Sequence, residues 1–154
     1  VPYITKTGTK IKDLKDPTKK MSKSEENPNG VISMFDSKDV IIKKIKGATT
    51  DSDMLIKFDE ENKPGISNLL NIASVISGKS ITDIENEFSG KNYGEFKNYV
   101  GEITSDRLTL IQSKYNDIIN SSELDTILDN GTRKTREIAK AKLELIKDKV
   151  GLGR

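Results

Sequence analysis

The chain has 154 residues, of which 33% are hydrophobic and 32% are charged, and its formal net charge is +2. It contains no cysteine, which excludes disulfides and thiolate metal sites, and without histidine a structural zinc site is not expected either. No apolar run approaches the roughly 18 residues that a membrane helix needs, and no signal peptide is evident. We therefore expect a soluble, cytoplasmic protein that holds no metal.

The first 35 residues predict short extended segments joined by turns. β-Branched residues are frequent from Val1 to about Leu14, which favours one or two short strands. Asp16-Pro17 then begins a turn. Further on, Val31–Phe35 is a short apolar run that suits either a strand or a packed extended segment. Strands this short need neighbours, so these residues are not expected to make a sheet of their own.

Helical periodicity begins near residue 37 and continues to about residue 150. Successive helices are predicted within Ser37–Gly47, Pro64–Gly78 and Ser80–Gly90. Each range opens with a capping serine or a proline and closes with glycine, which is the usual punctuation of a helix. The polar, acidic stretch at 49–63 is predicted to be a loop.

Two long helical stretches follow. The first runs from about Gly94 to Asn120, and the second begins at Ser122. Asn130-Gly131 is expected to end a helix there, because glycine and asparagine are common at helix C-termini. Thr132 would then start a last helix that reaches about Val150. The predicted fold class is therefore mainly α.

Lys20-Met21-Ser22-Lys23-Ser24, here called the lysine loop, carries the clearest chemistry of the chain. Its two lysines can supply two positive charges, its two serines can supply short donors, and exposed backbone N–H groups can add more. Such a loop suits a polyphosphate, because it can stabilise the charge that develops on a phosphate leaving group.

The last predicted helix is strongly basic, with seven Lys or Arg among residues 133–149. Four of them cluster within its first two turns: Arg133, Lys134, Arg136 and Lys140. Like charges at this spacing repel one another, so they do not stabilise the fold. Binding to an RNA phosphate backbone would explain the cluster, because each phosphate contact releases counterions. The alternative is a solvated face on which Glu137 and Glu144 pair with nearby lysines, and the sequence leaves both interpretations open.

Several motifs together resemble one enzyme family. The lysine loop is similar at all five positions to the KMSKS signature of class I aminoacyl-tRNA synthetases. Ala48-Thr49-Thr50-Asp51-Ser52 follows, and then Lys63-Pro64-Gly65-Ile66-Ser67-Asn68-Leu69-Leu70-Asn71-Ile72. With Asp16-Pro17-Thr18-Lys19 in front and Gly151-Leu152-Gly153-Arg154 at the end, this series resembles the C-terminal half of bacterial tryptophanyl-tRNA synthetases over essentially the whole chain.

This resemblance implies a fold and a division into domains. Residues 1–47 would be the end of a class I α/β, Rossmann-like catalytic domain that carries the KMSKS loop. Residues 48–154 would form a helical domain of the kind that binds the tRNA anticodon. The family's HIGH-type motif and tryptophan pocket lie in an N-terminal half that has no counterpart here. We therefore expect a piece of a larger enzyme that is inactive alone.

The resemblance also implies a reaction, which is activation of tryptophan with ATP followed by transfer to tRNA(Trp). Lys20 and Lys23 would contact the ATP phosphates as catalytic residues, while Ser22, Ser24 and the backbone near Met21 would help to hold the nucleotide. ATP with Mg²⁺ would serve the full-length enzyme, which would be a homodimer, and none is expected on this piece. Arg133, Lys134, Arg136 and Lys140 would meet the tRNA.

One alternative belongs to a different functional class. The chain could be a non-catalytic helical RNA-binding or adaptor module whose basic last helix meets a phosphate backbone. Neither interpretation involves DNA or a membrane. The two differ in whether the full-length protein carries out an ATP-dependent reaction.

Overall fold

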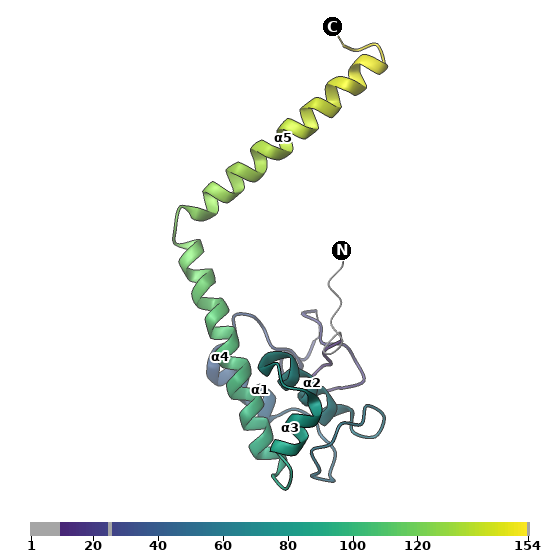
Figure 1. Ribbon diagram of the computed structural model, residues 1–154, viewed down its shortest axis with the longest axis vertical. Helices are drawn as coiled ribbons and strands as arrows, with labels where there is room; N and C mark the ends of the chain where they lie inside the picture. Colours follow the sequence, from purple (N-terminus) through teal and green to yellow (C-terminus); the bar gives the residue numbers. More distant parts are fainter. Residues whose placement is uncertain (1–9, 25, 154) are drawn as a thin grey trace. The chain divides into compact units, whose positions relative to one another are not determined.

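A computed structural model describes residues 10–24 and 26–153. These residues are mostly helical and contain no β-strand, which confirms the mainly α prediction for this part of the chain. The helices are η1 (Pro28–Gly30, a 3₁₀ turn), α1 (Lys38–Lys46), α2 (Pro64–Ser77), α3 (Ile81–Glu87), α4 (Tyr93–Ile119) and α5 (Glu123–Lys149) (Figure 1). Within the described residues, no helix combines the length and apolarity needed to cross a bilayer.

The chain divides into two compact units, Val1–Gln112 and Ser113–Arg154. The first contains α1, α2, α3 and most of α4, and the second contains the end of α4 and all of α5. The predicted boundary between residues 47 and 48 separates the end of a catalytic domain from a helical tRNA-binding domain. This division by function stays a prediction.

Helix ends in the first unit follow the local rules of the sequence. Ser37 precedes α1 and Gly47 follows it, donating its N–H to Lys43 O at 3.0 Å. Gly78 ends α2 at φ 73°, a left-handed conformation that glycine adopts without strain. Ser80 caps α3, because its Oγ accepts the Asp83 N–H at 3.1 Å. Capping signals therefore placed these boundaries well, although α3 ends at Glu87, before the predicted Gly90.

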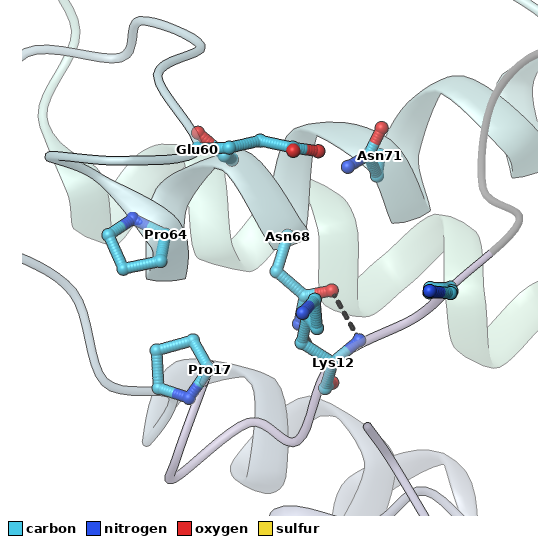
Figure 2. A pocket seen from close by; sticks show the side chains of 8 residues that line it. Lys12, Pro17, Glu60, Pro64, Asn68 and Asn71 are labelled. Atoms are coloured by element: carbon cyan, nitrogen blue, oxygen red, sulfur yellow. Dashed lines mark hydrogen bonds between the residues drawn. The ribbon is translucent and has the colours of Figure 1, made fainter. Parts of the chain in front are cut away.

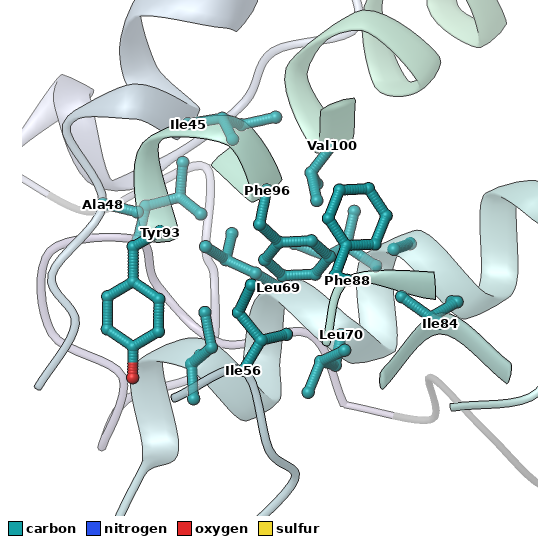
Figure 3. Packing of buried hydrophobic residues seen from close by; sticks show 14 of the residues in the cluster. Ile45, Ala48, Ile56, Leu69, Leu70, Ile84, Phe88, Tyr93, Phe96 and Val100 are labelled. Carbon is teal, nitrogen blue, oxygen red and sulfur yellow. The ribbon is translucent and has the colours of Figure 1, made fainter. Parts of the chain in front are cut away.

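The core of the first unit is built around α2 and the start of α4. Leu69, Leu70, Phe96 and Val100 are fully buried there (Figure 3). Phe88 meets the Phe96 ring edge-to-face, with ring centroids 5.1 Å apart and an interplanar angle of 67°. The same cluster includes Leu14, so the core also holds the segment that leads into the lysine loop. This packing fixes where that loop begins.

The predicted break at Asn130-Gly131 is wrong, because α5 runs through both residues. Gly78 ends α2 in the left-handed conformation, whereas Gly131 is not among the positive-φ glycines of the described residues and continues the helix. Glycine inside a helix costs only about 1 kcal/mol relative to alanine, and the long run of good helix formers after Thr132 outweighs that cost. No residue of α5 is buried among the described residues.

The predicted short strands do not form in the described part of the chain. Residues 1–9 lie outside the described residues, and residues 10–14 make a single antiparallel bridge, between Lys12 and Lys20. Val31–Phe35 is not a strand, and Ile32 packs partly buried against the core, as the packed-extended alternative predicted. A lone bridge is the most that these residues form, since the described part offers them no sheet to join.

Candidate functional site

The lysine loop leaves the core through a short antiparallel contact. Asp13 N donates to Lys19 O and Met21 N donates to Ile11 O, both at 3.0 Å. These two bonds flank the bridge between Lys12 and Lys20. The backbone of Lys20 is therefore fixed against residues 11–13, and the loop projects from that fixed point.

The turn before the loop is braced by two aspartates. Asp13, which is buried, accepts the N–H groups of Lys15 and Asp16 on Oδ1 at 2.7 and 2.9 Å. Asp16 accepts the Thr18 hydroxyl at 2.5 Å and pairs with Lys19 Nζ at 3.3 Å. The Thr18 hydroxyl, followed by the Thr18 N–H, holds the pKa of Asp16 below its usual value. The Asp16-Pro17 turn predicted from sequence therefore gives the loop a rigid entrance.

Within the lysine loop, apolar and polar side chains separate. Met21 is half-buried and packs against the core, while Lys20, Ser22, Lys23 and Ser24 are exposed. The Oγ atoms of Ser22 and Ser24 lie 3.0 Å apart. Among the described residues, neither Lys20 nor Lys23 forms an ion pair or a hydrogen bond through its ammonium group. The loop thus presents two exposed ammonium groups and two adjacent hydroxyls.

A second set of contacts ties the loop entrance to α2 through Thr49. Thr49 N donates to Leu14 O at 2.7 Å, and Thr49 Oγ1 donates to Lys15 O at 2.8 Å. Leu14 N donates to Gly30 O at 2.9 Å on the downstream side of the loop. Gly65, in the first turn of α2, lies so close that an added Cβ would be 2.1 Å from Thr49 O. Both arms of the lysine loop are therefore held by the folded helical unit.

One polar cluster was missed by the sequence analysis. Asp51 Oδ1 accepts the Tyr93 hydroxyl at 2.7 Å and pairs with Lys63 Nζ at 3.2 Å. Burial and the hydrogen bond to Asp51 raise the pKa of Tyr93 to about 12. Lys97 Nζ donates to Thr50 Oγ1 at 3.0 Å nearby. The residues around Lys63 and Tyr93 in the sequence form no pattern from which these long-range contacts could be predicted.

The basic residues predicted for tRNA lie on α5, in the second unit. Arg133, Arg136 and Lys140 share an exposed face and line a shallow hollow of about 330 Å³, whereas Lys134 does not line it. Glu137 also lines the hollow, and its carboxylate lies 3.9 Å from Arg133 Nη1. A pair at this distance on an exposed surface contributes little, so the face keeps most of its positive charge.

The donor set of the lysine loop fits an anion and not a metal ion. Ammonium groups and hydroxyls bind phosphate oxygens, whereas Mg²⁺ needs carboxylate, carbonyl or water oxygens. The described residues contain no group of three or more His, Cys, Asp or Glu that could hold a metal ion. A polyphosphate is therefore the ligand that this loop suits chemically.

Comparison with known proteins gives consistent matches. A family model described as tRNA synthetases class I (W and Y) matches residues 4–109. The tryptophan–tRNA ligases of Bacillus anthracis and Halalkalibacterium halodurans are 49% and 51% identical over 151 residues, which is 98% of this chain and 46% of each relative. The chain thus spans about half the length of the curated relatives it matches.

Solved structures agree with these matches. Tryptophanyl-tRNA synthetase from Mycoplasma pneumoniae is 37% identical with a TM-score of 0.81, over 97% of this chain and 45% of that one. The Campylobacter jejuni enzyme is 31% identical with a TM-score of 0.70, over 94% and 44%. The chain therefore belongs to the tRNA synthetases class I (W and Y), and the relatives it resembles here are bacterial tryptophanyl-tRNA synthetases.

Proposed function

We propose that this chain is the C-terminal part of a tryptophan–tRNA ligase, which activates tryptophan with ATP and transfers it to tRNA(Trp). Three observations support this proposal. The relatives bear that name, the chain spans 46% of their length, and residues 20–24 are similar to the KMSKS signature. In this proposal the chain supplies the phosphate-stabilising loop and a tRNA-binding helical domain at residues 48–154.

The observation that carries the proposal is the exposed lysine loop on a braced base, in which neither lysine ammonium pairs with a described residue. Lys20 and Lys23 would contact the ATP phosphates and neutralise the charge that grows on the pyrophosphate as the tryptophan carboxylate attacks. Ser22, Ser24 and the Met21 backbone would orient the same phosphates. The backbone anchor of the loop is fixed before ATP arrives, and one charge-stabilising donor of this kind is worth about 10²- to 10³-fold in rate. Mg²⁺ would accompany ATP and further neutralise its phosphates.

The helical residues would serve the second half of the reaction. Arg133, Lys134, Arg136 and Lys140 would bind the anticodon arm of tRNA(Trp), where arginine can grip phosphate and also stack on an unpaired base. The full-length enzyme would act as a homodimer. The 154-residue chain alone would not form tryptophanyl adenylate, because a lysine loop without adenine and tryptophan pockets cannot position both substrates.

The test is a pair of assays on the full-length protein, namely tryptophan-dependent pyrophosphate exchange and charging of tRNA(Trp). We expect both activities. A non-catalytic adaptor would bind RNA through α5 without either reaction, so RNA binding in the absence of pyrophosphate exchange would overturn the proposal in favour of that alternative.

A further inference from the structure

Asn68 on α2 holds the backbone that pairs with the lysine loop. Its side-chain amide makes two hydrogen bonds to one residue. Lys12 N donates to Asn68 Oδ1 at 2.8 Å (Figure 2), and Asn68 Nδ2 donates to Lys12 O at 2.9 Å. Asn68 is only 3% exposed, so both bonds are largely shielded from water. The buried amide satisfies both the backbone N–H and the backbone C=O of Lys12, so it fixes the position of that residue.

The segment at 11–13 is therefore held from two opposite sides. In an extended chain, the N–H and C=O of one residue point to one side, and those of its two neighbours point to the other. Lys12 uses its groups on Asn68, while Ile11 O and Asp13 N bond Met21 and Lys19. The Asn68 amide thus takes the place that a neighbouring strand would occupy in a sheet.

Asn68 itself has little freedom to move. Its neighbours Ile66, Leu69 and Leu70 on α2 are fully buried. Few side chains could replace it, since aspartate lacks the donor for Lys12 O, and leucine of similar size lacks both donor and acceptor. Glutamine would be one methylene too long for a site packed this closely.

We propose that Asn68 is a positioning residue for adenylate formation, acting through residues 11–13 to fix Lys20 and hence the ammonium groups of the lysine loop. This inference rests on the proposed function. Without the two amide bonds, Lys12 would lose its clamp, the bridge to Lys20 would loosen, and the loop charges would be misplaced relative to the ATP phosphates. A misplacement of about 1 Å costs roughly 100-fold in rate.

The test uses the full-length protein with Asn68→Asp, which removes the donor and adds a carboxylate charge, and with Asn68→Leu, which removes both donor and acceptor without a charge. Asn71→Asp is the matched control. It makes the same chemical change one turn along α2, beside the same small hollow, where the amide of Asn71 bonds to no described residue. Pyrophosphate-exchange kinetics are measured with each substrate varied, active sites are titrated, and amide hydrogen exchange is followed by mass spectrometry.

For both Asn68 variants we expect kcat per titrated site to fall between about 10- and 100-fold, with a raised KM for ATP and a KM for tryptophan within about twofold of wild type. Hydrogen exchange should accelerate in residues 10–24 while the peptides of α4 stay protected. Asn71→Asp should match wild type in every readout. This split separates positioning from simple loss of folded protein, which would lower the titrated sites and leave both KM values unchanged.

The inference is overturned if folded Asn68 variants keep wild-type kinetics, or if residues 10–24 exchange as slowly as in the unmodified protein. Failure of the proposed function has a different signature, which is absence of pyrophosphate exchange in the wild type. Hydrogen exchange then still decides whether Asn68 holds the loop: faster exchange confined to residues 10–24 supports the clamp, and unchanged exchange refutes it.

Discussion

Gly65→Ala is expected to destabilise the protein even though alanine favours helices. The new Cβ would lie 2.1 Å from Thr49 O, roughly 1 Å closer than folded proteins allow, and the atom it meets is backbone. Thr49 cannot retreat freely, because its N–H and hydroxyl are bonded to Leu14 O and Lys15 O. Any relief of the clash therefore pulls on the entrance to the lysine loop.

The magnitude follows from three opposing contributions to the free energy of unfolding. Losing the two Thr49 hydrogen bonds costs about 1 kcal/mol each. Overpacking a tight contact adds about 1–3 kcal/mol, and the higher helix propensity of alanine returns at most about 1 kcal/mol. We expect a net loss of about 2–4 kcal/mol.

Urea unfolding followed by circular dichroism measures this loss directly. Gly131→Ala is the control, because it makes the same change inside a helix where an added Cβ meets nothing within 4 Å. That variant should gain up to about 1 kcal/mol of local helix stability. A Gly65→Ala variant as stable as the parent protein would contradict this reasoning, because the backbone of Thr49 could then move away from the new Cβ without cost.

Three further predictions test other parts of the account. Changing Arg133 and Arg136 together to alanine in the full-length enzyme should preserve tryptophan activation but weaken tRNA charging and its salt dependence; unchanged charging kinetics would rule this face out. Absorbance titration at 295 nm should show one late tyrosine step near pH 12, which Tyr93→Phe removes; survival of that step in the variant would contradict the assignment. The pKa of Tyr93 is raised from 10.0 to about 12, so its contribution to the free energy of unfolding should be complete below pH 10 and be lost as the pH rises through 12. Urea titrations at several pH values should show this loss in the parent protein and not in Tyr93→Phe.

Local signals in the sequence predicted most of the helical framework. Pro64, Gly78 and Ser80 act through backbone conformation and capping, which depend on neighbouring residues only. The assignment of the lysine loop to phosphate chemistry stays a prediction, and it rests on charge and hydroxyl content, which need no tertiary information. The failure at Gly131 shows the limit of such rules, since a glycine followed by a long run of good helix formers can continue the helix.

The supports of the candidate site could not be read from the sequence. Asn68 is a polar residue that lies off the face formed by Ile66, Leu69 and Leu70 on α2, and its partner Lys12 lies 56 residues away. Asp51 and Tyr93 are 42 residues apart. Contacts across such separations depend on how the elements pack, and without that packing Asn68 would pass for an ordinary helix-surface residue.

The rate of tryptophanyl-adenylate formation in a single turnover tests the central claim most directly. Full-length protein carrying Lys23→Ala is compared with full-length protein carrying Lys19→Ala. Lys19 lies just before the lysine loop and pairs with Asp16. We expect Lys23→Ala to slow adenylate formation by about 10²- to 10³-fold while tryptophan affinity changes little, and Lys19→Ala to remain close to wild type. Equal rates in the wild type and Lys23→Ala, or an equal loss of tryptophan affinity, would contradict the assignment of the lysine loop to the ATP phosphates.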